Sequence, residues 1–198
     1  MAWDVEGTKR KLLDAATAEF SAFGLAGARV DRIAREAGVN KERIYEYFGK
    51  KDELFAAVLL DQLSIATDTV PIRGTGVDAV LDYVGRLFDH HVAAPALARL
   101  TAWEGLELGG AVGAEVRTAH IDRKLAAFRT ALPELPEASA RELQLTILVL
   151  VCGWQSLPNV DGLYRDPDAS SSARIAARRA ETVATIGARL REELAAQV

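Results

Sequence analysis

The sequence predicts an all-α protein in two parts, and three observations support this fold class. Apolar residues recur along the chain at the three- and four-residue spacing of amphipathic helices, and we find no convincing strand. Glycine and proline clusters interrupt this pattern. Two short helices joined by a tight turn are predicted within residues 30–48. We therefore expect a three-helix helix-turn-helix domain followed by a helical bundle, with about nine helices in all.

The first helix is predicted to run from Thr8 to about Phe23. Residues 1–7 are expected to form a loose arm, Thr8 to cap the helix and Gly24 to end it. The predicted inner face consists of Leu12, Ala16, Phe20 and Phe23. The cations of the first turn, which either contact DNA phosphates or form a solvated turn, are Lys9, Arg10 and Lys11.

Residues 30–48 have the spacing of a helix-turn-helix. The apolar face of the first helix is Val30, Ile33, Ala34 and Ala37. Gly38 can take the left-handed conformation that ends this helix, and the Asn40 side chain can cap the next one. Ile33, Val39 and Ile44 are expected to fix the crossing angle. A second helix held in this way presents its first residues to a DNA major groove. The alternative is a short helical hairpin in an unrelated bundle.

Residues 12–24, 30–48 and 44–58 together resemble the DNA-binding domain of the TetR (tetracycline-repressor-like) family of regulators. The most specific part of the resemblance is the run Tyr45, Tyr47, Phe48, Lys51, Glu53 and Leu54. Two positions depart from the family pattern. Arg29 stands where a Thr or Ser usually caps a helix, and Lys50 stands where a Ser or Asn usually caps the fourth helix. Each departure replaces a cap with a cation that can approach a phosphate.

The rest of the chain is predicted to be helical as well. A fourth helix from Lys51 to about Thr67 completes a DNA-binding domain of residues 1–67, and residues 68–76 form the boundary. An effector-binding and dimerisation domain is expected in residues 77–198. Its predicted helices are 77–93, 96–108, 111–132, 137–157 and 172–196. The connection from Pro158 to Ser172 is expected to be mobile.

The predicted DNA-contacting residues are Arg29, Asn40, Lys41, Arg43, Tyr45, Tyr47 and Lys51. Lys41 and Arg43 can donate hydrogen bonds to guanine O6 and N7. Tyr45 can contact a thymine methyl group or a phosphate. The family resemblance implies that Tyr47, Lys51 and Arg29 contact phosphates.

The last two predicted helices suggest a twofold dimer. The helix 137–157 contains the run ILVLVC, which is apolar all the way round and needs cover on more than one side. The helix 172–196 has two stripes: Val183, Ile186, Leu190 and Leu194 on one, and Ala176, Ala180, Ala184 and Gly187 on the other. One stripe can meet the body and the other a partner. The alternative is an ordinary buried core helix, whereas the resemblance implies a homodimer on a palindromic operator.

The resemblance also implies a small-molecule site among the body helices. Its candidate lining residues are Tyr83, Leu87, His91, Trp103, His120, Phe128, Trp154 and Gln155. Trp103 and Phe128 lie on predicted helices, where such side chains more often belong to the core than to a pocket. The adjacent His90 and His91 make a poor metal pair. We expect no cofactor and no metal.

Composition limits the remaining function classes. The net charge is −4, yet residues 1–55 contain ten Lys or Arg and ten Asp or Glu, so the acidic excess lies in the second part. No run approaches the length of a membrane span and the N-terminus has no signal-like apolar stretch, so a cytoplasmic protein is expected. The single Cys152 excludes an internal disulfide.

The sequence therefore predicts a ligand-responsive repressor that binds DNA as a dimer. One alternative is a helix-turn-helix regulator without a small-molecule effector, which is controlled by a protein partner. The other, an enzyme, is less favoured because none of the phosphate-loop, zinc-protease or serine-hydrolase motifs is present in the sequence.

Overall fold

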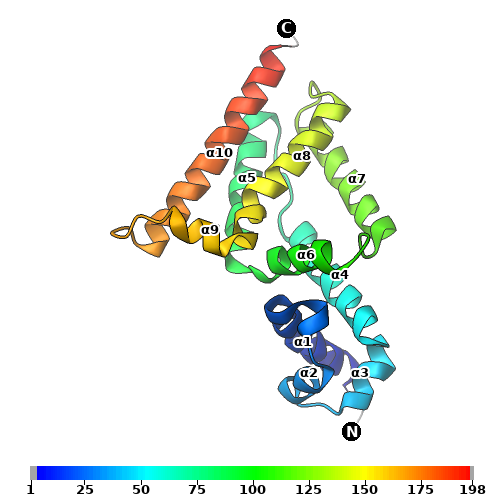
Figure 1. Cartoon of the computed structure of the whole chain (residues 1–198). Helices are drawn as coiled ribbons and strands as arrows, with labels where there is room; N and C mark the ends of the chain where they lie inside the picture. The colour runs from blue at the N-terminus through cyan, green and yellow to red at the C-terminus, as the bar shows by residue number, and fades with distance from the viewer. Residues whose placement is uncertain (1–3, 197–198) are drawn as a thin grey trace. The chain divides into compact units, whose positions relative to one another are not determined.

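The computed structural model describes residues 4–196, apart from the side chains of residues 67 and 68, and these residues form helices without any strand (Figure 1). The helices are α1 (Val5–Gly27), α2 (Val30–Ala37), α3 (Lys41–Phe48), α4 (Lys51–Thr69), α5 (Gly76–Ala93), α6 (Ala96–Glu107), α7 (Ala114–Ala131), α8 (Glu137–Cys152), the 3₁₀ helix η1 (Gly153–Ser156), α9 (Pro158–Leu163) and α10 (Ser171–Ala195). The predicted all-α fold class is confirmed. Within the described range there is one α-helix more than expected. The additional helix is α9, which lies inside the connection that we predicted to be mobile and has Pro158 in its first turn, where proline is well tolerated.

The helices pack into two compact units. The first unit contains the residues up to Ile65 together with Ala96–Ala114, and the second contains Ala66–Pro95 together with the residues from Glu115 onward. The sequence placed residues 96–114 in the C-terminal domain. In the structure α6 packs against α1 instead, so this segment belongs to the unit that contains the helix-turn-helix.

The start of α1 differs from the prediction. The helix begins at Val5, because the Asp4 side chain accepts a hydrogen bond from the Gly7 backbone N–H at 2.8 Å. Thr8 is therefore not the cap, and its hydroxyl donates to the Asp4 carbonyl within the first turn. Of the predicted arm, residues 1–3 lie outside the described residues, and residues 5–7 are helical.

The core of the first unit confirms most of the predicted inner faces. Leu12, Ala16 and Phe20 are fully buried, and the Phe20 and Phe55 rings meet edge to face with centroids 5.2 Å apart. Phe23 was predicted to join them, but it is 49% exposed. The regular helix ends directly after Phe23 at the kink of Gly24, and the Arg32 guanidinium lies over the exposed ring at 4.4 Å from its centroid.

The second unit is built around α5, which packs against both α8 and α10 (Figure 1). Its largest fully buried side chains include Phe88, Phe128 and Ile147. The predicted body stripe of α10 is confirmed, because Ile186 and Leu190 are buried while Val183 and Leu194 pack against the core. Gly187 was placed on the opposite stripe, and this was wrong. Gly187 is buried, and a Cβ there would lie 3.3 Å from the side chain of Leu81 on α5.

Candidate nucleic-acid interface

The turn between α2 and α3 has the predicted geometry. Gly38 adopts the left-handed conformation (φ 66°, ψ 32°). The backbone N–H groups of Gly38 and Val39 donate to the carbonyls of Arg35 and Ala34 at 3.2 and 3.0 Å. The Asn40 side chain accepts the Glu42 backbone N–H at 3.4 Å and so caps α3. Ile33 and Ala34 of α2 and Ile44 of α3 are buried, and this packing fixes the orientation of α3 relative to α2.

A buried carboxylate of α1 secures the start of α2. Glu19 is only 9% exposed, and it accepts hydrogen bonds from the Arg29 backbone N–H at 2.8 Å and from Arg32 Nε at 2.7 Å. Arg29 itself provides no side-chain cap, so Glu19 substitutes for the Thr or Ser expected there. Burial alone raises the pKa of Glu19, but the hydrogen bonds and charges of Arg32 and Arg29 outweigh it and leave this pKa below its usual value.

We expect Glu19→Gln to lower the free energy of unfolding by about 2 kcal/mol at pH 7, because glutamine still accepts one hydrogen bond but cannot pair with the Arg32 charge. A carboxyl with a lowered pKa stabilises the folded state above its unfolded-state pKa, and this contribution is lost as the pH falls through the folded-state value. The difference between variant and wild type should therefore shrink below the ordinary Glu pKa of 4.5.

Urea unfolding at several pH values measures this effect. Glu36→Gln is the matched control, because Glu36 is an exposed acid of α2. An equal loss of stability at neutral and acidic pH would contradict the assigned role of Glu19.

Five of the predicted DNA-contacting residues lie on α3 or at its N-cap. Asn40 and Tyr45 are exposed, and Lys41, Arg43 and Tyr47 are half-buried. Lys41 Nζ lies 2.8 Å from Asp31 Oδ1, and this hydrogen bond raises the pKa of Lys41. Arg43 forms an ion pair with Glu46 at 2.7 Å and lies 5.9 Å from the centroid of the Tyr47 ring. Both cations therefore hold carboxylates that a nucleic acid would have to displace.

Lys51, which was predicted to contact a phosphate, has other contacts in the structure. Lys51 Nζ donates to the carbonyls of Ala26 and Ala28, both at 3.3 Å, and so links the first turn of α4 to the last turn and C-cap of α1. An ammonium group has three N–H donors, and the two carbonyls accept from two of them. The third donor could still bind a phosphate, so this contact of Lys51 stays a prediction. The backbone N–H of Lys50 donates to Glu53 Oε2 at 2.6 Å, so Glu53 compensates for the missing Ser or Asn cap of α4.

Helix α6 is bonded to the end of α1 through polar side chains. Arg99 Nε and Trp103 Nε1 donate to the Ser21 carbonyl at 2.6 and 3.3 Å. The Glu107 carboxylate accepts the backbone N–H groups of Leu25 at 2.5 Å and of Ala26 at 3.2 Å. Trp103 was predicted to line a ligand pocket in the body, whereas the structure places it in the first unit beside α1.

The other predicted pocket residues lie in the second unit, and they separate into two groups. Tyr83, Leu87 and Phe128 belong to the apolar core. His91 is 3% exposed, and burial together with the neighbouring His90 lowers its pKa to about 4. His120 is half-buried on α7.

The second group lines cavities. Trp154 borders one of about 290 Å³ and, together with Gln155, another of about 240 Å³. Gln155 Nε2 also donates to the His91 carbonyl at 3.1 Å, which holds the amide beside the core.

Two absences concern the part of the chain that the structure describes. Among residues 4–196, no helix is long and apolar enough to cross a membrane. The same residues contain no cluster of three or more His, Cys, Asp or Glu side chains that could hold a metal ion.

The helix-turn-helix and the helical second unit define a class of DNA-binding transcriptional regulators. Residues 12–58 match the model of bacterial regulatory proteins of the tetR family, and residues 79–189 match that of the tetracyclin repressor-like C-terminal domain. The chain belongs to the tetR family of regulators, and the function predicted from the α2–α3 motif is confirmed at this level.

Individual relatives agree with this assignment. The HTH-type transcriptional repressor SCO4008 of Streptomyces coelicolor is 42% identical over 156 residues, which cover 76% of this chain and 79% of the relative. The crystal structure of SCO4942 from the same organism has a TM-score of 0.72 at 31% identity, and the match covers 90% of this chain and 96% of SCO4942. FadR of Bacillus subtilis, crystallised with stearoyl-CoA, shares the fold with a TM-score of 0.64 at 15% identity, over 90% of this chain and 97% of FadR.

Proposed function

We propose that the protein is a dimeric repressor that binds a palindromic operator and is released from it when a small molecule binds the second unit. The exposed side of α3 is the observation that carries the proposal. It places Asn40, Lys41, Arg43 and Tyr45 at the start of a helix that the Gly38 turn and Glu19 hold in position. Asn40, Lys41 and Arg43 can donate hydrogen bonds to base edges in a major groove, and the Tyr45 ring can make an apolar contact there.

An uncovered apolar stripe on α8 supports the dimer. Ala140, Leu143, Ile147 and Val151 are buried in the second unit, which accounts for one face of the helix. On another face Leu145, Leu148 and Val149 are 57%, 38% and 57% exposed, at the spacing of a second helical stripe. The exposed alanines Ala176, Ala180 and Ala184 provide a small-residue surface on α10. A second copy of the chain would cover these surfaces and supply a second α3 for the other half-site.

The cavities bordered by Trp154 support a small-molecule effector. Their volumes of about 290 and 240 Å³ approach the lower end of the range common for ligand sites. FadR of Bacillus subtilis, which shares the fold, was crystallised with stearoyl-CoA. A ligand can release the operator only by binding better to the conformation that fits DNA poorly.

Selection of bound fragments from the source genome tests the DNA-binding part of the proposal. We expect a palindromic sequence whose half-sites lie about one helical turn, or a multiple of it, apart. Binding should weaken steeply with salt, since phosphate contacts release counterions. Enrichment of a single half-site without a symmetric mate would contradict the dimeric mode.

Two substitutions separate base reading from phosphate contact. We expect Arg43→Ala to lower operator affinity by about tenfold and to relax the preference at one base pair of each half-site. Lys51→Ala should weaken binding to all sequences alike, since a phosphate contact carries no sequence information.

Binding titrations on operator variants measure both effects. Arg123→Ala removes an exposed cation of α7 and serves as the control. Because Lys51 also binds the carbonyls of Ala26 and Ala28, the unfolding curve of the Lys51→Ala protein must be recorded in parallel. An equal loss across all sequences for Arg43→Ala would overturn its assignment.

A further inference from the structure

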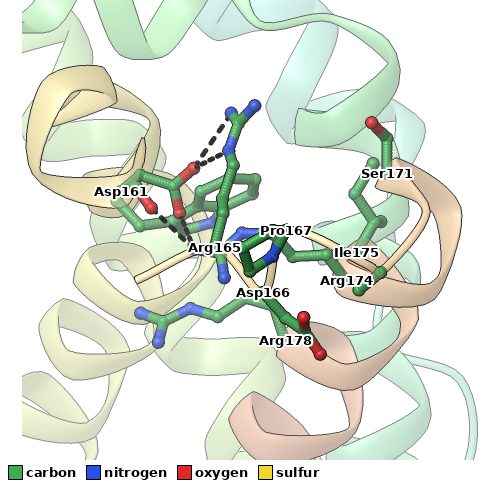
Figure 2. A pocket seen from close by; sticks show the side chains of 10 residues that line it. Asp161, Arg165, Asp166, Pro167, Ser171, Arg174, Ile175 and Arg178 are labelled. Carbon is green, nitrogen blue, oxygen red and sulfur yellow. Dashed lines mark hydrogen bonds and ion pairs between the residues drawn. The ribbon is translucent and has the colours of Figure 1, made fainter. Parts of the chain in front are cut away.

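A pocket at the start of α10 contains more positive than negative side chains (Figure 2). It has a volume of about 290 Å³ and lies wholly in the second unit. Its charged lining residues are Arg165, Arg174, Arg178, Asp161 and Asp166. The formal charge of the lining is thus one positive unit in excess.

Two of the three arginines share one carboxylate as their ion-pair partner, that of Asp161. Arg165 donates to Asp161 Oδ2 from Nε and from a terminal nitrogen at 3.3 and 3.2 Å. Arg174 pairs with Asp161 Oδ1 and also donates to the Tyr164 carbonyl at 3.0 Å. The hydrogen bond from Arg174, followed by that from Arg165, holds the pKa of Asp161 below its usual value. Asp161 is therefore a saturated anion that fixes the positions of both arginines.

Arg178 has no such compensation. Its guanidinium makes no hydrogen bond or ion pair with any residue in the described part of the chain, and its buried Nε has no partner. Figure 2 shows dashed lines that join Asp161 to Arg165 and Arg174, whereas none reaches Arg178. The second acid of the lining, Asp166, instead accepts the backbone N–H of Asp168 at 3.0 Å. An anion in the pocket would supply the charge partner that the Arg178 guanidinium lacks.

The uncharged residues of the lining are apolar apart from Ser171. Trp154 and Ile175 are among them, and both pack against the core of the second unit. The indole is held in place, because it stacks on Phe88 with centroids 6.1 Å apart and its Nε1 donates to the Val151 carbonyl at 3.0 Å. The pocket thus offers a fixed aromatic surface beside an uncompensated guanidinium.

The neighbouring cavity of about 240 Å³ shares Trp154, Asp161, Arg165 and Ile175 with this pocket, so the two adjoin. Gln155 lines the second cavity, and its Oε1 is buried without a hydrogen-bond partner among the described residues. A ligand that extends past the shared residues would meet a polar acceptor at its far end.

We propose that this pocket binds a small organic anion, a carboxylate or phosphate monoester with an apolar or aromatic body. The anionic group pairs with Arg178, and the body lies against Trp154 and Ile175. That this anion is the effector rests on the proposed function; that the pocket binds it does not.

Calorimetric titration of the full-length protein tests the pocket with matched probes. Benzoate is compared with neutral benzamide, and phenyl phosphate with phenol, so that the two arms distinguish a carboxylate from a phosphate ligand. At least one anion should bind about tenfold tighter than its neutral counterpart. Arg178→Gln should weaken that anion by about tenfold, whereas Arg123→Gln, which removes an exposed cation of α7, should not change it. The proposal is overturned if both anions bind no better than their neutral counterparts, or if the two variants bind alike.

Operator binding, measured on the same samples, separates this result from the proposed function. Arg178→Gln should bind the operator as the wild type does, because Arg178 belongs to the second unit and the helix-turn-helix belongs to the first. It should also be folded, since Arg178 has no partner to lose. If the wild type fails to bind any palindrome, the proposed function is wrong while the anion titration still decides the pocket. If the selected anion binds but leaves the operator complex intact, its assignment as effector is overturned.

Discussion

Replacing Val149 with aspartate is expected to leave the protein monomeric and to lower its affinity for a palindromic operator by about a hundredfold or more. Val149 is 57% exposed in the protomer and belongs to the second apolar stripe of α8 with Leu145 and Leu148. A carboxylate buried in a dimer interface without a partner is strongly unfavourable. When the two helix-turn-helix units are no longer linked in a dimer, binding of one to its half-site no longer raises the effective concentration of the other at the second half-site.

Sedimentation velocity and operator titration measure the two parts of this prediction. Because Val149 is exposed in the protomer, the substitution should preserve the helical circular dichroism spectrum. Leu145→Asp, on the same stripe, should reproduce the result, whereas Ala126→Asp, at an exposed position of α7, should remain dimeric. A Val149→Asp protein that is still dimeric at micromolar concentration would show that another surface forms the interface.

The helix-turn-helix could be predicted from the sequence because its signals are local. Gly38 ends one helix and Asn40 caps the next within three residues, and both act through their own backbone neighbours. The burial of Ile33 and Ile44 follows from helical spacing alone. Short-range patterns of this kind need no knowledge of the rest of the fold.

Contacts between distant residues could not be predicted in the same way. Glu19 lies on the inner face of α1, directly before Phe20, and an acid in such a stripe could have indicated a buried partner. Its partners, however, lie ten and thirteen residues further along the chain. Lys51 has the family's spacing, but only the folded chain shows its ammonium bonded to the carbonyls of Ala26 and Ala28.

The same reason explains the pocket residues. Trp103 and Phe128 both have the helical apolar spacing of core residues, and sequence cannot tell which unit α6 joins. Arg178 is one of several arginines in an otherwise solvated stretch of α10, and its uncompensated charge becomes visible only when Asp161 is found to hold Arg165 and Arg174.

Gly24→Ala should lower the free energy of unfolding of the first unit by about 3 kcal/mol or more. Gly24 has φ 67° and ψ −175°, a conformation that is essentially restricted to glycine and costs other residues about 1–3 kcal/mol. An added Cβ would also lie 2.7 Å from the Trp103 ring and 2.7 Å from Glu107 Oε1. Either the α1 kink or the position of α6 must change, and overpacking of this kind adds about 1–3 kcal/mol.

This substitution should also weaken operator binding. Glu107 accepts the N–H groups of Leu25 and Ala26, the residues that lead into α2, so a displaced Glu107 releases the connection that sets the start of the helix-turn-helix. Urea unfolding followed by circular dichroism, and operator titration at a temperature where the variant is folded, measure the two effects separately.

Gly105→Ala provides the matched control on α6. A Cβ at Gly105 meets no atom within 4 Å, and alanine is favoured over glycine inside a helix by roughly 0.5–1 kcal/mol, so this variant should be slightly more stable than the wild type. The two glycine substitutions are thus expected to change stability in opposite directions. If the Gly24→Ala protein proved as stable as Gly105→Ala, the packing of Trp103 and Glu107 against the α1 kink could not be what holds α6 against α1.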